Sequence, residues 1–168
     1  MCRLVTAKQP NSKMCLVCGL KNAFGLRSFF YELDNNDLLA IFKPLEEHQG
    51  YPNRLHGGIA TAVLDETVGR AIMIAYSEDV WGVTIEFTTR YKRPIPLDSE
   101  LRVVGRVTRD TKRHFEGSGE IMLADGSIAA AGYGKYLKLP IGKIADFDLA
   151  AQEWQVVPSE DDPAEVDL

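Results

Sequence analysis

A histidine, two glycines and an acid are spaced along one stretch of the chain in a way that suits acid–base chemistry. His56-Gly57-Gly58 ends a loop, and Asp65 follows two turns into the apolar segment that comes next. Glycines at a loop-to-helix junction let the backbone approach a ligand, and the unpaired amides of the first turn can hold a developing oxyanion. His56 has two open interpretations, a residue that orients the loop or one with a direct chemical role.

Asp65 is the strongest catalytic candidate, because an ionised carboxylate in an apolar helix is costly without a partner or a task. The alternative is a buried acid capped by local hydroxyls. Thr61 and Gly69 lie one turn away on the same face, and both are small enough to leave room for a substrate. Glu66 has a structural explanation, because Arg70 follows four residues later in the favourable order for an ion pair.

One long helix and several strands must position these residues. Residues 57–76 lack proline and are apolar on most faces, which predicts a buried central helix. Alternating apolar residues and turn signals predict six strands, over residues 25–33, 38–42, 83–88, 101–108, 115–123 and 128–139. An apolar helix can bury its circumference only inside a curved sheet. We therefore predict an α+β fold with a six-stranded antiparallel sheet wrapped around one long central helix.

The two ends of the chain carry weaker signals. Residues 1–13 have no periodic pattern and stay unassigned, and residues 14–140 form the predicted single domain. Apolar residues at helical spacing predict a short amphipathic helix over 141–157. Residues 158–168 contain five acids and no base, so we expect a solvated acidic tail.

Composition excludes several classes of protein. The chain has 168 residues, 45% of them hydrophobic, which is enough for one domain with a core. It has 19 Lys and Arg against 24 Asp and Glu, so the body is neutral without the five tail acids and offers no basic face to nucleic acid. Charged residues interrupt the longest apolar stretch, so we expect no membrane span. The cysteine usage and the lack of a secretory pattern predict a cytoplasmic protein.

His-Gly-Gly, an acid nine residues after the histidine, and a strand that ends in Tyr91-Lys92-Arg93-Pro94 form a fairly specific set. With these motifs, the chain resembles the hotdog-fold acyl-CoA thioesterases of the phenylacetate and hydroxybenzoyl-CoA type. The resemblance covers about residues 15–139. The resemblance implies the hotdog fold, which agrees with the architecture predicted from periodicity. It also implies hydrolysis of an acyl-CoA or a related thioester, with no cofactor.

The resemblance assigns roles to residues of this chain. Asp65 would act as the nucleophile or as a general base toward water, and a backbone amide at Gly57 or Gly58 would polarise the thioester carbonyl. Thr84 would supply a strand hydroxyl across a dimer interface. We therefore expect a homodimer or a homotetramer, which would also cover an open sheet edge.

One position departs from the family pattern. Many relatives carry Asn or Gln six residues before the histidine of His-Gly-Gly, where this chain has Gly50. Gln49 and His48 are the expected substitutes in substrate binding. Lys92 and Arg93, with Arg113 in a later turn, are candidates to bind the phosphates of coenzyme A, unless they are ordinary solvated charges.

Cys15-Leu-Val-Cys18-Gly19 has the spacing of half a zinc site or of a redox pair. The other half is missing, because Cys2 and three scattered histidines are the only further soft ligands. We predict no metal and interpret this segment as a reduced loop near the substrate channel.

Two other functions stay open at this point. Hotdog dehydratases also use a histidine and an acid, and the sequence from His48 to Pro52 faintly resembles their His-containing loop. Asp65 follows His48 by seventeen residues, however, and not by the fourteen of that pattern. The other possibility is a non-catalytic acyl-ligand binding protein that keeps the pocket.

Overall fold

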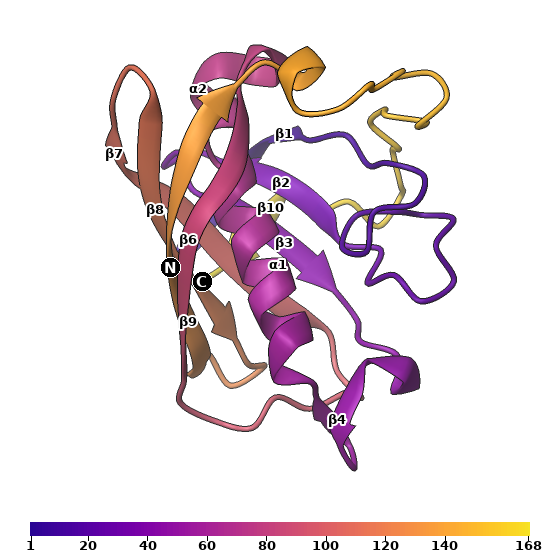
Figure 1. Ribbon diagram of the computed structural model, residues 1–168. Coiled ribbons are helices and arrows are strands. Elements are labelled where there is room, and N and C mark those ends of the chain that lie inside the picture. Colours follow the sequence, from indigo (N-terminus) through magenta and orange to yellow (C-terminus); the bar gives the residue numbers. More distant parts are fainter.

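Eight antiparallel strands form one curved sheet around a central helix. The computed structural model describes all residues, 1–168, and orders the strands β10-β1-β2-β3-β7-β8-β9-β6 (Figure 1). The strands are β1 (Cys2–Lys8), β2 (Phe29–Leu33), β3 (Leu38–Phe42), β6 (Trp81–Tyr91), β7 (Leu101–Asp110), β8 (His114–Met122), β9 (Ile128–Leu139) and β10 (Glu165–Asp167). A separate two-stranded ribbon is formed by β4 (Gln49–Tyr51) and β5 (Arg54–Leu55). The predicted fold class is confirmed, and all six predicted strands are present.

The central helix, α1 (Gly57–Arg70), packs on β3 and on β6 to β9. Its buried apolar residues recur at the spacing of one helical face: Ala60, Val63, Leu64 and Val68. Beyond Arg70 the chain continues through a tighter turn, in which the Ile74 amide donates to the Ala71 carbonyl, into α2 (Met73–Tyr76). The helix predicted over 57–76 is therefore present as two segments. None of the helices has the length and apolar character needed to cross a bilayer.

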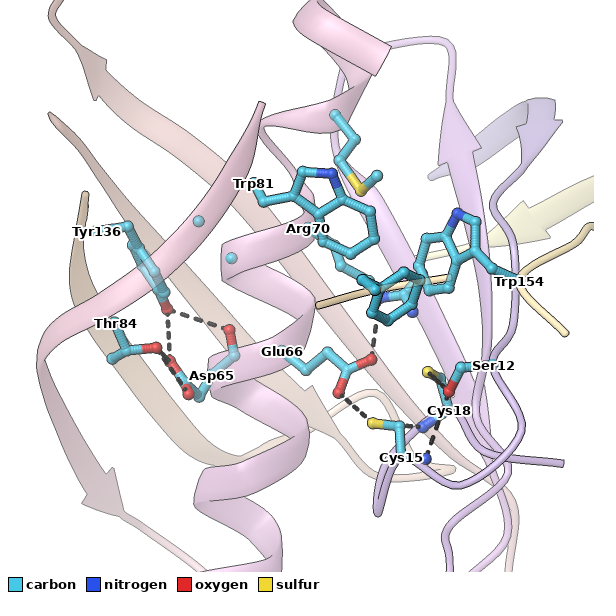
Figure 2. A pocket seen from close by; sticks show the side chains of 14 residues that line it. Ser12, Cys15, Cys18, Asp65, Glu66, Arg70, Trp81, Thr84, Tyr136 and Trp154 are labelled. Atoms are coloured by element: carbon cyan, nitrogen blue, oxygen red, sulfur yellow. Dashed lines mark hydrogen bonds and ion pairs between the residues drawn. The ribbon is translucent and has the colours of Figure 1, made fainter. Parts of the chain in front are cut away.

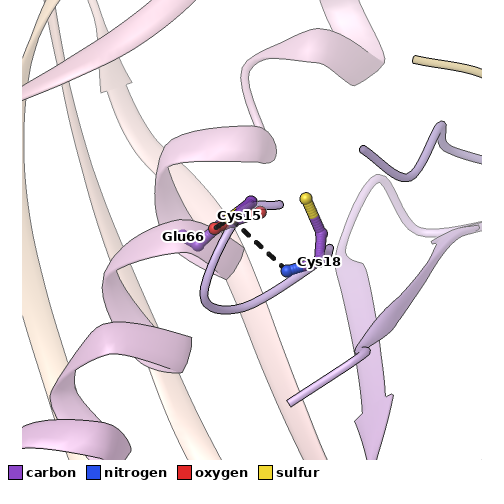
Figure 3. A group of neighbouring side chains, drawn as sticks. All are labelled: Cys15, Cys18 and Glu66. Carbon is purple, nitrogen blue, oxygen red and sulfur yellow. Dashed lines mark hydrogen bonds between the residues drawn. The ribbon is translucent and has the colours of Figure 1, made fainter. Parts of the chain in front are cut away.

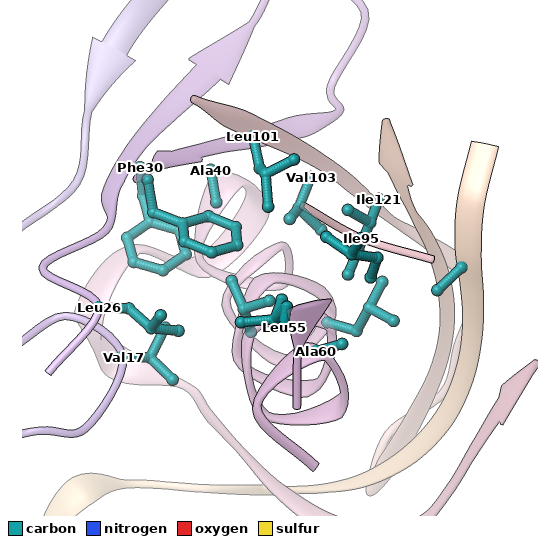
Figure 4. Packing of buried hydrophobic residues seen from close by; sticks show 14 of the residues in the cluster. Val17, Leu26, Phe30, Ala40, Leu55, Ala60, Ile95, Leu101, Val103 and Ile121 are labelled. Atoms are coloured by element: carbon teal, nitrogen blue, oxygen red, sulfur yellow. The ribbon is translucent and has the colours of Figure 1, made fainter. Parts of the chain in front are cut away.

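The loop between β1 and β2 packs against α1 and completes the core. Val17 and Leu26 from this loop belong to the same buried cluster as Ala60 (Figure 4). Figure 4 places Val17 and Leu26 beside the helix, on the opposite side from Ile121. The loop that carries the Cys-x-x-Cys motif is therefore anchored on the helix that carries Asp65.

Both ends of the chain add strands that the sequence pattern did not predict. Part of the unassigned segment 1–13 forms β1, which pairs with β2 and with β10. The expectation of a solvated tail over 158–168 is wrong for β10, because Val166 is buried in a cluster on the sheet. The Lys8 ammonium group binds the carboxylate of Asp162 and offsets part of the negative charge of the tail. The Tyr31 hydroxyl donates a hydrogen bond to the same carboxylate.

The amphipathic helix predicted over 141–157 is absent. Only a 3-10 turn, Ile141–Lys143, forms there, and Glu153 has φ 50°, which an α-helix does not accommodate. The aromatic residues of this segment pack on Trp81 instead, with ring centroids 5.8 Å away for Phe147 and 4.8 Å away for Trp154. The apolar spacing of the segment therefore reflects contacts with the domain and not helix formation.

The close approach of α1 to the sheet depends on glycines in β8. A Cβ atom at Gly117 would lie 2.6 Å from Val68 Cγ1 and 2.7 Å from the carbonyl oxygen of Arg106. We expect Gly117→Ala to lower the free energy of unfolding by about 1–3 kcal/mol, because overpacking forces backbone or helix shifts. Urea unfolding measures the change. Gly142→Ala is the matched control, since a Cβ there meets no atom within 4 Å. Equal stabilities of the two variants would contradict this account of the packing.

Candidate active site

Asp65 lies in the wall of a pocket of about 340 Å³ that aromatic side chains partly enclose, and we call it the Asp65 pocket (Figure 2). Thr84 Oγ1 on β6 lies 3.0 and 3.1 Å from the two carboxylate oxygens, and the Tyr136 hydroxyl on β9 donates to Oδ1 at 3.0 Å. These two hydroxyls are the only side-chain partners of the carboxylate, and no cation pairs with it. The acid is thus held in place without being neutralised.

The sheet register explains why two hydroxyls meet at this carboxylate. Thr84 and Tyr136 are directly opposite one another in the pairing of β6 with β9, so their side chains project from the same face of the sheet. The Tyr136 ring stacks on Phe115 with centroids 4.7 Å apart. Gly69 leaves space for it, because a Cβ at that position would lie 3.2 Å from the ring.

Burial shifts the pKa values of both Asp65 and Tyr136. It raises the pKa of the Asp65 carboxyl, and the hydrogen bonds from Thr84 and Tyr136 act in the opposite direction. Burial, followed by the charge of Asp65, raises the pKa of the Tyr136 hydroxyl, so this hydroxyl stays protonated as a donor. A carboxyl whose pKa is shifted upward is a better proton acceptor near neutral pH than an ordinary aspartate.

The start of α1 offers a second group with chemical capacity. His56 caps the helix, and its Nδ1 accepts a hydrogen bond from the Gly58 amide at 2.9 Å. The Gly57 amide has no acceptor within the chain, whereas its carbonyl accepts a hydrogen bond from the Tyr91 hydroxyl at 2.7 Å. Of the two predicted amides, only the Gly57 amide is therefore free to bind an oxyanion. The geometry of His56 agrees with the interpretation that it orients the loop.

Asp65 and the Gly57 amide of one chain do not face a common point. Eight residues separate them along α1, and a rise of about 1.5 Å per residue places them about 12 Å apart. Thr84 bonds to Asp65 of its own chain. The expectation that Thr84 reaches an acid across a dimer interface is therefore wrong, because β6 already runs beside α1 within one chain.

Comparison with known proteins places this geometry in a family context. A family model described as Thioesterase superfamily matches residues 53–130, which include α1, β6 and β7. A crystal structure described as a thioesterase superfamily protein has a TM-score of 0.67 and 27% sequence identity, over 73% of this chain and 59% of that one. The chain has the hotdog fold of the thioesterase superfamily. The resemblance found in the sequence is thereby confirmed.

Two further proteins are similar to this chain, one without a described function and one with a lower sequence identity. An uncharacterized protein of Schizosaccharomyces pombe is 28% identical over 99 residues, which are 59% of this chain and 56% of the yeast protein. The Escherichia coli PaaI protein, from the phenylacetic acid degradation operon, has a TM-score of 0.60 and 18% identity over 68% of this chain and 80% of PaaI. The chain thus spans less than two thirds of the length of the yeast protein and of the thioesterase superfamily structure above.

The loop before the hotdog helix uses its polar side chains internally. The buried His48 ring accepts from the Leu45 amide at 2.9 Å through Nδ1 and donates to the Phe24 carbonyl at 2.6 Å through Nε2. Gln49 Oε1 accepts from the Asn53 amide at 2.9 Å. Both predicted substrate-binding side chains therefore hold the loop, and His48 has no nitrogen left for a ligand. Gly50 packs on His56, because a Cβ there would lie 3.0 Å from His56 Cα.

Of the two small residues predicted to flank Asp65, only Gly69 lines the Asp65 pocket. Thr61 lies one turn nearer to the start of α1, where its hydroxyl bonds to Thr89 at 2.9 Å and to Tyr91 at 2.8 Å. Thr61 therefore belongs with the Gly57 amide and not with the carboxylate.

The predicted phosphate-binding residues lie at opposite ends of the sheet. The amides of Lys92 and Arg93 donate to the Ala129 carbonyl near the start of β9, whereas the Arg113 carbonyl accepts from Lys138 near its end. These points are about 30 Å apart along a strand that rises about 3.3 Å per residue. Within one chain, Arg113 and the Lys92-Arg93 pair cannot bind the same ligand.

Sequence reasoning missed several residues that line the Asp65 pocket. Tyr136 is one, and its only signal was its position on a strand that pairs with the strand of Thr84. The predicted ion pair of Glu66 with Arg70 is confirmed at 2.9 Å, but Glu66 also accepts from Cys15 Sγ at 3.1 Å. Cys15 and Cys18 line the pocket as well, which agrees with the interpretation of this segment as a loop near the substrate channel. No spacing rule in the sequence links the cysteine loop to this position of the helix.

Proposed function

We propose that this protein hydrolyses an acyl-CoA or a related thioester, with Asp65 as nucleophile or general base and the Gly57 amide as oxyanion donor. The observation that carries the proposal is a half-buried carboxylate that is oriented by two hydroxyls, lacks a cation and faces a pocket. Such a group is poised to accept a proton or attack a carbonyl carbon. We assign this activity to the domain of residues 14–140.

The chemistry requires few groups. In the general-base route, Asp65 takes a proton from water while the water oxygen attacks the thioester carbonyl, and the carbonyl oxygen becomes an oxyanion at the Gly57 amide. Collapse of the tetrahedral intermediate breaks the carbon–sulfur bond and releases a thiolate, which departs readily without a strong acid. In the nucleophilic route, the carboxylate attacks the carbonyl carbon, the carbon–sulfur bond breaks with release of the thiolate, and water then hydrolyses the mixed anhydride to the free acid and regenerates Asp65.

A complete site needs two copies of the chain. Along β6, Tyr91 lies beside Gly57 and Thr84 lies beside Asp65. β6 is the free edge of the sheet, and Ile85 is 58% exposed on it. Antiparallel pairing of two β6 edges around Phe87 would set the Thr84 end of one copy against the Tyr91 end of the other. This pairing brings the Gly57 amide of one copy toward Asp65 of the second.

The same pairing reconciles the positions of the basic residues. Arg113 lies near the Trp81 end of β6, and Lys92 and Arg93 follow its Tyr91 end. When two copies of β6 run antiparallel, Arg113 of one copy and the Lys92-Arg93 pair of the other reach the same end of the shared groove. These side chains are therefore our candidates for contacts with the phosphates of a coenzyme A tail.

Release of free thiol from a panel of acyl-CoAs, with short, long and aromatic acyl groups, tests the proposal. We expect at least one substrate to release thiol at a rate well above that of the buffer. The same panel should include a trans-enoyl-CoA assayed for hydration, for which we expect no activity because both His48 nitrogens bond to the backbone. Binding of acyl-CoA without thiol release from any member would contradict hydrolysis and favour the ligand-binding alternative.

Tyr136→Phe tests the positioning role of the tyrosine hydroxyl. The variant keeps the ring that stacks on Phe115 and removes the hydrogen bond to Asp65 Oδ1. We expect kcat to fall by about ten- to a hundredfold with little change in KM, since a hydrogen bond to a charged group contributes about 1.5–3 kcal/mol. Tyr133→Phe is the matched control, because that hydroxyl bonds to Glu116 outside the pocket. A change in KM alone would contradict the assignment.

A further inference from the structure

Three side chains with metal-binding atoms converge on one wall of the Asp65 pocket. The sulfurs of Cys15 and Cys18 and a carboxylate oxygen of Glu66 all lie within 4.8 Å of one another (Figure 3). The cysteines come from the loop between β1 and β2, and Glu66 comes from α1. The set joins segments about fifty residues apart in sequence, which explains why the Cys-x-x-Cys motif appears incomplete in the sequence.

The cysteine loop is shaped around the sulfur of Cys15. The amides of Val17 and Cys18 point at Cys15 Sγ, at 3.3 and 3.5 Å. The turn closes tightly, because the Gly19 amide donates to the Cys15 carbonyl at 2.9 Å and a Cβ at Gly19 would lie 2.4 Å from that oxygen. Two amides directed at one sulfur favour an anionic ligand there.

The remaining ligand atoms are oriented by neighbours outside the set. Arg70 Nε donates to Glu66 Oε1 at 2.9 Å, which leaves Oε2 directed at Cys15 Sγ, 3.1 Å away. Ser12 Oγ lies 3.2 Å from Cys18 Sγ. Outer partners of this kind fix the direction of metal ligands and strengthen binding.

The charges of the site also fit a divalent cation. Two thiolates and the Glu66 carboxylate carry three negative charges, and the buried guanidinium of Arg70 carries one positive charge. A dication brings the sum to zero, so burial of the loaded site is not opposed by a net charge. Two sulfurs and one carboxylate oxygen match the ligand preference of Zn²⁺.

We propose that Cys15, Cys18 and Glu66 bind one Zn²⁺ ion, with release of the two thiol protons. Three protein ligands leave one position of a tetrahedral zinc site open, and all three residues line the pocket that Asp65 also lines. The open position therefore faces the pocket, where water or a substrate sulfur can complete the coordination. Zinc binding can be measured independently of the proposed hydrolysis, since Asp65 is not among the ligands.

Metal titration of the full, reduced chain tests the proposal. Zn²⁺ is removed with a chelator and then added back against a chromophoric chelator of known affinity. We expect one equivalent of Zn²⁺ per chain and about two protons released per ion at a pH where both thiols are protonated. Co²⁺ added to the same protein should give sulfur-to-cobalt charge-transfer absorption, a readout that needs no variant and no enzymatic activity.

Variants locate the site. Cys15→Ser and Cys18→Ser should each weaken Zn²⁺ binding by more than a hundredfold, because loss of an outer partner alone costs about 10- to 100-fold. Ser12→Ala should fall within that smaller range. Cys2→Ser is the matched control and should bind as the parent does, since Cys2 lies on β1 and bonds to Glu165. Asp65→Asn should also bind Zn²⁺ normally, so failure of zinc binding and failure of thioester hydrolysis are separate results.

Two results would overturn the proposal. One is a reduced parent chain that binds no Zn²⁺ and gives no thiolate band with Co²⁺. The other is binding that Cys2→Ser weakens as much as Cys15→Ser does. Formation of a Cys15–Cys18 disulfide under mild oxidation, in a chain that binds no metal when reduced, would assign the pair to redox chemistry instead.

Discussion

Asp65→Asn is expected to lower kcat for thioester hydrolysis by about 10²- to 10⁴-fold, the usual contribution of a positioned acid–base group. Asparagine has nearly the same shape and can still accept hydrogen bonds from Thr84 and Tyr136, so the pocket should keep its structure. We expect substrate affinity to change by less than about tenfold, because the carboxylate acts mainly in the transition state. Steady-state kinetics of thiol release, with affinity measured separately on the inactive variant, checks both parts.

The control for this substitution is another aspartate with no place in the pocket. Asp79 is exposed in the 3-10 turn Ser77–Asp79 that follows α2, and Asp79→Asn should retain the parental kcat. Full activity in Asp65→Asn would show that the carboxylate has only a structural role. Loss of activity in both variants would point to a general effect of charge on the protein.

Gly57→Pro should reduce kcat by about 10²- to 10³-fold relative to Gly57→Ala, the size observed when one oxyanion donor is removed. Proline lacks the amide hydrogen, yet it suits the first position of a helix. The preceding His56 has φ −62° and ψ 134°, a conformation that proline accepts in its neighbour. Alanine and proline both add a Cβ, which lies 3.3 Å from the Tyr91 ring, so the two variants share this crowding. Their ratio therefore isolates the amide hydrogen, and equal rates would exclude this amide as the donor.

Mixing the two inactive variants tests whether the site is shared between copies. In a dimer of one Asp65→Asn chain and one Gly57→Pro chain, one of the two shared sites keeps both the carboxylate and the amide. Random pairing should restore about a quarter of the parental activity. If Asp65 and Gly57 of the same chain acted together, every mixed dimer would be inactive, and no activity would return on mixing.

Much of the fold could be predicted from local patterns. The turn signal at Asp125-Gly126 predicted a strand on each side of it, and β9 has the predicted bounds, residues 128–139. The strands formed by residues 2–8 and 165–167 could not be predicted in this way. β10 has only three residues and lies at the edge of the sheet, and β1 lies between it and β2. Their pairing depends on residues that are far apart in the sequence, such as Lys8 and Asp162.

Only part of the candidate site could be predicted, because local patterns show some of its residues and long-range contacts bring in the others. Asp65 stands out as a charge in an apolar helix. The family resemblance pointed to Thr84, but across a dimer interface and not to Asp65 of the same chain. Tyr136 and the cysteine loop are brought to α1 by sheet register and by core packing, and neither leaves a periodic signal. His48 misled the prediction, because a histidine next to a glycine-rich loop is equally suited to bonding the backbone.

Both tryptophans of the chain, Trp81 and Trp154, line the Asp65 pocket, and their ring centroids lie 4.8 Å apart. All indole fluorescence of the protein therefore originates at the pocket. An acyl chain, a coenzyme A or a metal ion that enters should alter this emission directly, so ligand screening needs neither a label nor an assumed substrate.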